Sequence, residues 1–219
     1  MRRLQTDHID VYWLHAVDAT TPIEETLRAM DDLIRVGKVR YIGCCNFAAW
    51  QLCEALWRSD VRGLHAFAAI QNQYSLLNRW ELEPELMPLC KKYGLGIMVY
   101  SPLAIGLLTG QFRRGQPPMP GTPWADHPHH SAHFAEVMTE RVDALIQLLI
   151  DIGRVQNKTP AQIAIAWVLD HPEVNSAIIG PDKPEHVDEV LGALDCKLTA
   201  EERVRLDLAS EVKGPVKFA

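Results

Sequence analysis

Short apolar runs alternate with longer amphipathic stretches along most of the chain. The apolar runs are rich in β-branched and aromatic residues, a composition typical of strands. Apart from one long interruption they recur about every thirty residues, which is the length of a βα unit. This alternation predicts a parallel sheet covered by helices. The strands are expected at residues 8–15, 39–42, 67–71, 96–100 and 176–179.

Helix signals lie between these strands. Thr21-Pro22-Ile23-Glu24 indicates a capping box with proline at the first helical position. An apolar stripe follows, and Gly37 is expected to end the helix. The stripe consists of Ile23, Leu27, Met30 and Ile34. The next helix, 48–58, is expected to bury Leu52, Cys53 and Leu56. Further helices are expected at 84–93, 135–155 and 159–171, from Pro184 to about Leu194, and after Thr199. Thr159 with Gln162 and Thr199 with Glu202 are expected to cap two of them.

Residues 106–134 interrupt this regular pattern. The segment is rich in Gly, Pro and His and lacks a sustained period, which predicts a long loop of the kind that usually has a function. Its histidines, His127, His129, His130 and His133, suggest a metal site at first sight. No cysteine lies nearby and carboxylates occur only at Asp126 and Glu136, so a variable substrate loop is favoured and no metal site is expected.

Composition narrows the class of protein. The chain has 219 residues and a formal net charge of -6, which argues against nucleic acid or an anionic membrane surface as the main partner. No apolar run approaches the ~20 residues that span a bilayer, and no apolar segment follows Met1-Arg2-Arg3 as it would in a signal peptide. The five cysteines lack C-x-x-C spacing, which indicates reduced thiols and a cytoplasmic location. Cys44 and Cys45 are expected to be packing thiols rather than a redox pair.

His15 is the first candidate for chemistry. It ends the first predicted strand, directly before a loop, and parallel α/β barrels build their active sites from such positions. The alternative is a hydrogen-bonded core histidine. Five strands are fewer than the eight of a closed barrel, so the pattern fits either an open sheet or part of a barrel.

An ordered set of motifs carries a resemblance to a known family. The set comprises Asp7-His8-Ile9-Asp10-Val11-Tyr12-Trp13-Leu14-His15, Gly37-Lys38-Val39-Arg40-Tyr41-Ile42-Gly43, Cys45-Asn46-Phe47, Tyr100-Ser101-Pro102-Leu103, and Ile179-Gly180-Pro181 with Pro184-Glu185-His186. Over nearly the whole chain it resembles the aldo-keto reductases, particularly the bacterial branch related to potassium-channel β subunits. The resemblance implies an α/β fold, a partial (β/α)8 TIM barrel with about five parallel strands (units 4 to 8). It further implies a single domain over 1–219 that lacks the family's first three βα units.

The resemblance also assigns a catalytic residue. His15 matches the histidine of the family's catalytic tetrad, which orients and polarises the substrate carbonyl. The tetrad's Asp, Tyr and Lys belong to the first three units, and the Tyr is the proton donor. We therefore expect little or no reductase activity from this chain alone.

Further matches concern the nicotinamide cofactor. The resemblance implies that Cys45, Asn46 and Gln71 contact the nicotinamide carboxamide, although Asn46 could instead be the N-cap of the next helix. Tyr100 matches the aromatic that stacks on the nicotinamide ring, with a core aromatic as the alternative. The pyrophosphate loop would consist of Ser101, Pro102, Leu103 and Gly106.

The last phosphate-binding stretch departs from the family pattern. Its candidate binding positions are Gly180, Lys183, His186 and Glu189. Glu189 is retained, whereas His186 takes the place of an Arg or Gln. Asp182 stands where the family often has Arg, Ser or Thr, and an anion repels a 2′-phosphate. The alternative is that Lys183, next to it, compensates for this charge. Val190 replaces an adenine-contacting Asn, and Gln111 replaces a phosphate-binding Lys. The expected cofactor is NADP (NADPH), with NAD as the alternative.

Three hypotheses on function follow. The first is an NAD(P)H-dependent aldo-keto reductase acting on a small-molecule carbonyl, an aldehyde or ketone, of which this chain supplies the cofactor-binding part. The second is a non-catalytic nicotinamide-binding subunit or pseudoenzyme. The third is an inactive truncated fragment, whose unpaired sheet edges would favour self-association.

Overall fold

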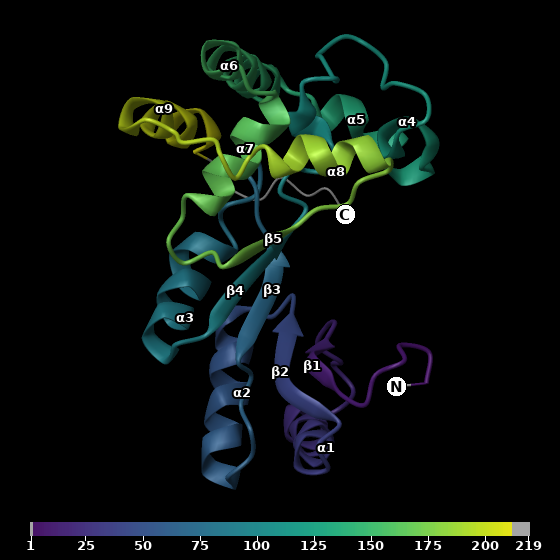
Figure 1. The fold of residues 1–219 in the computed structure, drawn as a ribbon, viewed down its shortest axis with the longest axis vertical. Helices are drawn as coiled ribbons and strands as arrows, with labels where there is room; N and C mark the ends of the chain where they lie inside the picture. Colours follow the sequence, from purple (N-terminus) through teal and green to yellow (C-terminus); the bar gives the residue numbers. More distant parts are fainter. Residues whose placement is uncertain (1, 212–219) are drawn as a thin grey trace. The chain divides into compact units, whose positions relative to one another are not determined.

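The structure, a computed structural model, describes residues 2–211 and forms a five-stranded sheet with helices between the strands (Figure 1). The strand order is β1-β2-β3-β4-β5, the order of the chain, as in successive βα units. The predicted α/β class with parallel strands and the partial (β/α)8 barrel are confirmed. The strands are β1 Ile9–Leu14, β2 Val39–Cys45, β3 Ala69–Gln73, β4 Gly96–Tyr100 and β5 Ser176–Ile178.

The helices follow the predicted pattern with some changes of boundary. They are α1 Ile23–Arg35, α2 Ala49–Arg62, α3 Met87–Tyr93, α4 Pro123–Asp126, α5 Pro128–Val137, α6 Glu140–Gln156, α7 Pro160–Leu169, α8 Pro184–Leu191 and α9 Ala200–Ser210. A π-helical turn, Leu82–Leu86, precedes α3, and a 3-10 turn, Leu107–Thr109, follows β4. Within residues 2–211, no helix is both long enough and apolar enough to span a bilayer.

The chain divides into two compact units. Unit 1 comprises residues 1–72 and 82–98, and unit 2 comprises residues 73–81 and 99–219. The single domain predicted over 1–219 remains a prediction.

Unit 1 is built on the paired strands β1, β2 and β3. The register places Leu14 beside Cys44 and Cys45 beside Gln71, so the carboxyl ends of the three strands are aligned. Helices α1 and α2 pack against each other, and α1 also packs against β2. The interior is fully closed to solvent at Leu27, Ile42, Leu52 and Ile70. Burial of this apolar surface is the main stabilising contribution to the unit.

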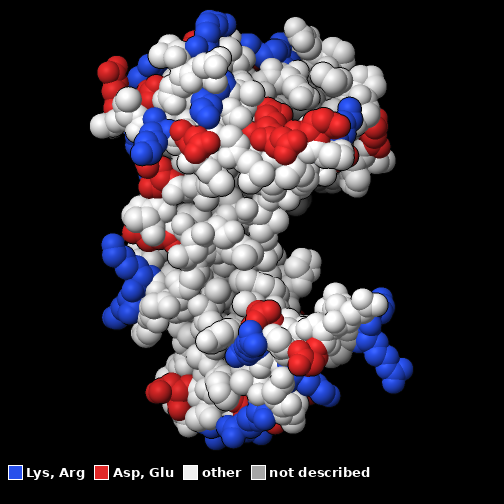
Figure 2. All heavy atoms as spheres, viewed as in Figure 1, with Lys and Arg blue, Asp and Glu red and all other residues white. Residues whose placement is uncertain are grey.

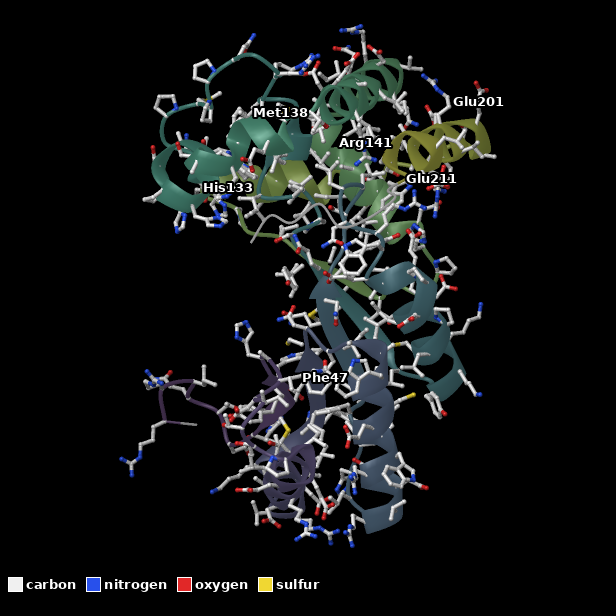
Figure 3. All side chains as sticks on the ribbon, turned by 180° about the vertical axis from the view of Figure 1, so that it is seen from behind. Phe47, His133, Met138, Arg141, Glu201 and Glu211 are labelled. Atoms are coloured by element: carbon white, nitrogen blue, oxygen red, sulfur yellow. The ribbon has the colours of Figure 1, made fainter. Side chains whose placement is uncertain are left out.

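Unit 2 is built on α6, which packs against both α7 and α9. Trp167 of α7 is fully buried; its indole N–H donates to Asp207 Oδ1 at 2.9 Å, and Tyr74 stacks on it at 5.4 Å between ring centroids. Arg141 of α6 donates to the backbone carbonyl of Glu211, directly after α9, at 3.0 Å (Figure 3). The apolar core and these polar contacts together hold the helices of this unit on one another.

Capping boxes explain where two of these helices begin. Thr159 and Thr199 each accept a hydrogen bond from the backbone N–H three residues later, and Gln162 and Glu202 complete the boxes, as predicted. The box predicted at Thr21 is wrong. Its hydroxyl donates to Asp18 Oδ2 at 2.7 Å, and α1 begins after Pro22 without a side-chain cap.

Two predicted helical faces also need correction. In α2 the buried positions are Leu52, Ala55 and Ser59, whereas Cys53 is exposed, because the inward face follows the helical period more closely than the predicted stripe. The predicted long helix 135–155 begins at Glu140, where Thr139 provides the N-cap.

The segment 106–134 is not a long irregular loop as predicted. It contains the 3-10 turn, α4 and most of α5. Prolines occupy the start of both α-helices, at Pro123 and Pro128, where the missing N–H costs nothing. Trp124 and Phe134 are buried, so tertiary packing stabilises helices whose local sequence shows no clear period.

Gly153 of α6 offers a test of this packing. A Cβ there would lie 2.5 Å from the backbone carbonyl oxygen of Lys158, closer than real contacts allow. Helix propensity alone predicts that Gly153→Ala stabilises the protein by about 1 kcal/mol. We expect destabilisation instead, because the backbone at Lys158 must move to make room for the added methyl group. Urea denaturation should show a loss of about 1–2 kcal/mol in the free energy of unfolding. A more stable Gly153→Ala variant would contradict the close packing of Gly153 against the Lys158 carbonyl oxygen.

Candidate functional site

A pocket of about 430 Å³ lies within unit 2. The loop after β4 forms one wall and the passage from β5 into α8 forms another. Residues between these segments, including Thr109, Phe112 and Pro123, complete the lining. The volume lies in the range of small-molecule and cofactor sites. The predicted residues that line it are Tyr100, Ser101, Pro102, Leu103, Gly106, Gly180, His186 and Glu189.

The loop after β4 has an unusual backbone. Ser101, Ala104 and Ile105 have positive φ angles of 53°, 50° and 56°, and Gly106 has 85°. For a β-branched residue such as Ile105 this is a strained conformation that costs about 1–2 kcal/mol. Such strain persists only where the surroundings hold it, and it concentrates at ligand sites.

Trp124 of α4 holds this loop in place. Its indole N–H donates to the carbonyl oxygen of Ile105 at 2.9 Å, and its side chain is only 1% exposed. Phe134 and His130 pack against the ring, with centroids 5.8 and 5.2 Å away. The sequence prediction missed Trp124, although an isolated Trp after Thr-Pro in a polar segment was a usable signal.

The second wall of the pocket is the passage from β5 into α8. A Cβ at Gly180 would meet no atom within 4 Å, so the backbone there is open to a ligand. Gln162 of α7 donates to the carbonyl oxygen of Glu189 at 2.6 Å and so ties α8 to α7. Lys183 is the N-cap residue of α8 and is exposed; it is not part of the pocket lining.

The other predicted residues gather within unit 1, at the carboxyl ends of its strands. Asn46 Nδ2 donates to the carbonyl oxygen of His15 at 3.1 Å, and Asn46 N donates to that of Gln71 at 3.0 Å. Asn46 has a φ of 60°, a left-handed conformation that Asn tolerates better than most residues. The N-cap of α2 is Ala48, so the alternative that Asn46 caps this helix is wrong.

The side chains in this group differ in their surroundings. His15 is exposed, and Gln71 Nε2 lies 3.7 Å from the sulfur of Met98. Cys45 is buried, and burial raises the pKa of its thiol. Burial likewise raises the pKa of Cys44. Both therefore stay neutral thiols at neutral pH, as expected of packing residues.

The histidines of the 106–134 segment lie at the start of α5 and along it. The rings of His129 and His133 stack at 4.5 Å, and His127 lies 4.7 Å from His130. Burial, followed by electrostatic repulsion from the neighbouring histidines, lowers the pKa of His130. Within residues 2–211, no group of three or more His, Cys, Asp or Glu side chains is arranged to hold a metal ion.

An ion pair fastens the pocket-lining segment to α6. Arg113, next to Phe112 of the lining, donates to Asp143 through Nε at 2.8 Å and through Nη2 at 3.0 Å. These bonds, followed by one from the backbone N–H of Arg114, lower the pKa of Asp143 from its usual 3.8 to about 2.

The lowered pKa of Asp143 makes the stability of the protein depend on pH. Because the folded-state pKa is depressed, the stabilisation is fully present above about pH 4 and is lost as the pH falls towards about 2. We expect Asp143→Asn to flatten the fall in Tm over this interval, measured by circular dichroism at several pH values. Glu140→Gln, at an acidic residue of the same helix, is the control. An unchanged pH profile in Asp143→Asn would contradict the role of this pair.

Comparisons with known proteins identify the family of this chain. The aldo/keto reductase family model matches residues 1–211. The uncharacterized oxidoreductase YrpG of Bacillus subtilis is 34% identical over 201 residues, covering 92% of this chain and 58% of the relative. A probable voltage-gated potassium channel subunit beta of Oryza sativa is 35% identical over 197 residues, with coverages of 89% and 59%. The aldo-keto reductase str7 of Strobilurus tenacellus is 36% identical over 220 residues, with coverages of 98% and 62%.

The chain thus spans about 60% of the length of these curated relatives. The family model, however, covers every residue from 1 to 211, and the five βα units observed are those of the family fold. From its sequence and its fold, the chain belongs to the aldo/keto reductase family.

Proposed function

We propose that this chain is the cofactor-binding part of an NAD(P)H-dependent oxidoreductase that reduces an aldehyde or ketone. The observation that carries the proposal is the pocket of about 430 Å³, because the residues predicted for the pyrophosphate and the adenosine converge on it. Its walls offer left-handed backbone at Ser101 and at 104–106, and an open approach at Gly180. Backbone of this kind binds phosphate oxygens through N–H groups.

Each predicted residue has a role in this proposal. The loop Ser101–Gly106 would bind the pyrophosphate, and Tyr100 would stack on the nicotinamide ring. The roles of Cys45, Asn46 and Gln71 at the carboxamide, and of His15 at the substrate carbonyl, rest on the family resemblance. A bound nicotinamide supplies the hydride. The resemblance assigns no residue of this chain to the proton-donating Tyr, so we expect binding with little turnover.

The first experiment is a titration of the purified chain with NADH and NADPH, followed by tryptophan fluorescence. We expect saturable quenching, and no quenching with either dinucleotide would refute the proposal. Oxidation of the reduced cofactor in the presence of a reactive aldehyde then measures catalysis.

A pocket-filling variant locates the binding site. Because a Cβ at Gly180 meets no atom within 4 Å, Gly180→Phe should fold normally and occupy ligand volume. We expect it to weaken dinucleotide binding by about tenfold or more, at an unchanged Tm. Asp188→Phe, on the exposed side of α8, is the matched control. Equal affinities of the two variants would place the ligand elsewhere.

A second candidate function is a non-catalytic nicotinamide-binding subunit. Three of the relatives are named as probable or putative potassium channel β subunits, from Oryza sativa, Arabidopsis thaliana and Schizosaccharomyces pombe. Tight dinucleotide binding without aldehyde reduction, also in a longer chain that carries the Asp, Tyr and Lys of the family's tetrad, would favour this candidate over the reductase.

A further inference from the structure

The charge of the pocket in unit 2 bears on which dinucleotide it accepts. Its charged lining side chains are Asp182 and Glu189, both acidic, and the lining residues include no lysine or arginine among those that the structure describes. Both acids belong to the wall formed by the passage from β5 into α8. The described part of the lining therefore has acidic residues and no basic Lys or Arg on that side.

Two neighbouring cations, Arg113 and Lys158, are engaged with other groups. Arg113 donates to Asp143 and, through Nη1 at 2.8 Å, to Gln147. Lys158 Nζ donates to the carbonyl oxygen of Gly192 at 3.0 Å. Lys183 is exposed, as Asp182 is, but of the two only Asp182 belongs to the pocket lining.

The sequence around the pocket wall is acidic as a whole. Residues 182–189 contain one lysine against a set of carboxylates, and the space-filling view shows acidic side chains gathered over α8 (Figure 2). The carboxylates are Asp182, Glu185, Asp188 and Glu189. Lys183 can offset only one of them.

The two forms of the dinucleotide respond to this charge in opposite ways. The 2′-phosphate of NADPH carries nearly two negative charges at neutral pH and needs cationic or N–H donors. The free 2′-hydroxyl of NADH is a donor, and in dinucleotide sites an acidic side chain accepts its hydrogen bond, whereas an arginine accommodates the 2′-phosphate. We propose that this pocket selects NAD(H) over NADP(H), with Asp182 as the residue that determines the specificity.

The inference rests on the proposed dinucleotide site, and titrations with NADH and NADPH separate the two. At pH 8 and low ionic strength we expect NADH to bind about tenfold more tightly, the effect of a carboxylate beside a doubly charged phosphate in water. 5′-AMP and 2′,5′-ADP, as competitors, should show the same order.

Charge reversal identifies the residue responsible. Asp182→Arg should raise the affinity for NADPH about tenfold or more and change that for NADH little. Asp188→Arg is the matched control: it makes the same change of net charge, but Asp188 lies on α8 and does not line the pocket. It should leave the ratio of the NADH and NADPH affinities near its original value. Equal or tighter binding of NADPH by the unmodified chain would overturn the selectivity, and an equal response of the two variants would overturn the role of Asp182. Failure to bind either dinucleotide would instead refute the proposed function.

Discussion

Trp124→Ala is expected to lower the free energy of unfolding by about 3–5 kcal/mol, the usual cost of removing a fully buried tryptophan. The ring is 1% exposed and packs against Phe134 and His130. The variant also lacks the hydrogen bond to the carbonyl oxygen of Ile105, which holds the strained backbone from Ala104 to Gly106 in place. We expect dinucleotide affinity to fall at least about tenfold as that loop relaxes. Urea denaturation and fluorescence titration measure the two effects.

Trp124→Phe separates the contribution of the hydrogen bond to Ile105 from that of the packing of the aromatic ring. It keeps an aromatic ring but removes the N–H, which should cost about 1 kcal/mol of stability. Amide hydrogen exchange of residues 101–109 should accelerate in this variant. Trp50→Ala, at a side chain that is 67% exposed, is the control and should change little. Unchanged exchange in Trp124→Phe would show that the hydrogen bond to Ile105 does not hold the loop.

Asp31→Ala is expected to cost about 2 kcal/mol, because it removes the hydrogen bonds that a buried carboxylate accepts from Arg35 and His65. Both partner side chains are exposed, so water can replace part of what they lose. Asp31 lies on α1, is 3% exposed and pairs with Arg35. It also accepts hydrogen bonds from the backbone N–H of His65 at 2.9 Å and from its Nδ1 at 2.6 Å, which joins α1 to the segment after α2. Asp32→Ala, at the exposed neighbouring position, should change stability by less than about 0.5 kcal/mol.

The same network makes unit 1 sensitive to acid. The hydrogen bond from Arg35, and then that from the backbone of His65, hold the pKa of Asp31 well below its usual value. This stabilisation is present above about pH 4 and is lost as the pH falls below the ordinary range of an aspartate. In thermal melts the difference in Tm between the parent and Asp31→Asn should stay constant from pH 6 to about pH 4 and begin to shrink between pH 4 and pH 3. Parallel curves would argue against a charged Asp31 in the folded protein.

Local patterns in the sequence predicted elements whose causes are themselves local. The capping boxes at Thr159 and Thr199 and the stop at Gly37 depend on neighbours within a few residues, and the structure contains all three. Strand positions followed from short apolar runs, because a buried strand needs one wherever it lies. The box at Thr21 was wrong because Asp18 competes for its hydroxyl.

The segment 106–134 shows why local patterns were insufficient elsewhere. Its helices α4 and α5 have weak local signals and are stabilised by burying Trp124 and Phe134. The buried role of Asp31 was equally invisible, because its partner His65 lies 34 residues away. The helical face of α2 likewise depends on what α1 presents to it, which left Cys53 exposed.

The sequence by itself determined the order of the βα units, the family, and which residues are candidates for the cofactor site. Only the tertiary structure decided that the segments after β4 and β5 enclose one pocket, that Trp124 braces its strained wall, and that its charged lining is acidic. The physical reason is the distance along the sequence over which the residues interact. Strand period, caps and motifs depend on residues a few positions apart, whereas a pocket's shape and charge arise from segments some eighty residues apart that meet only when the chain is packed.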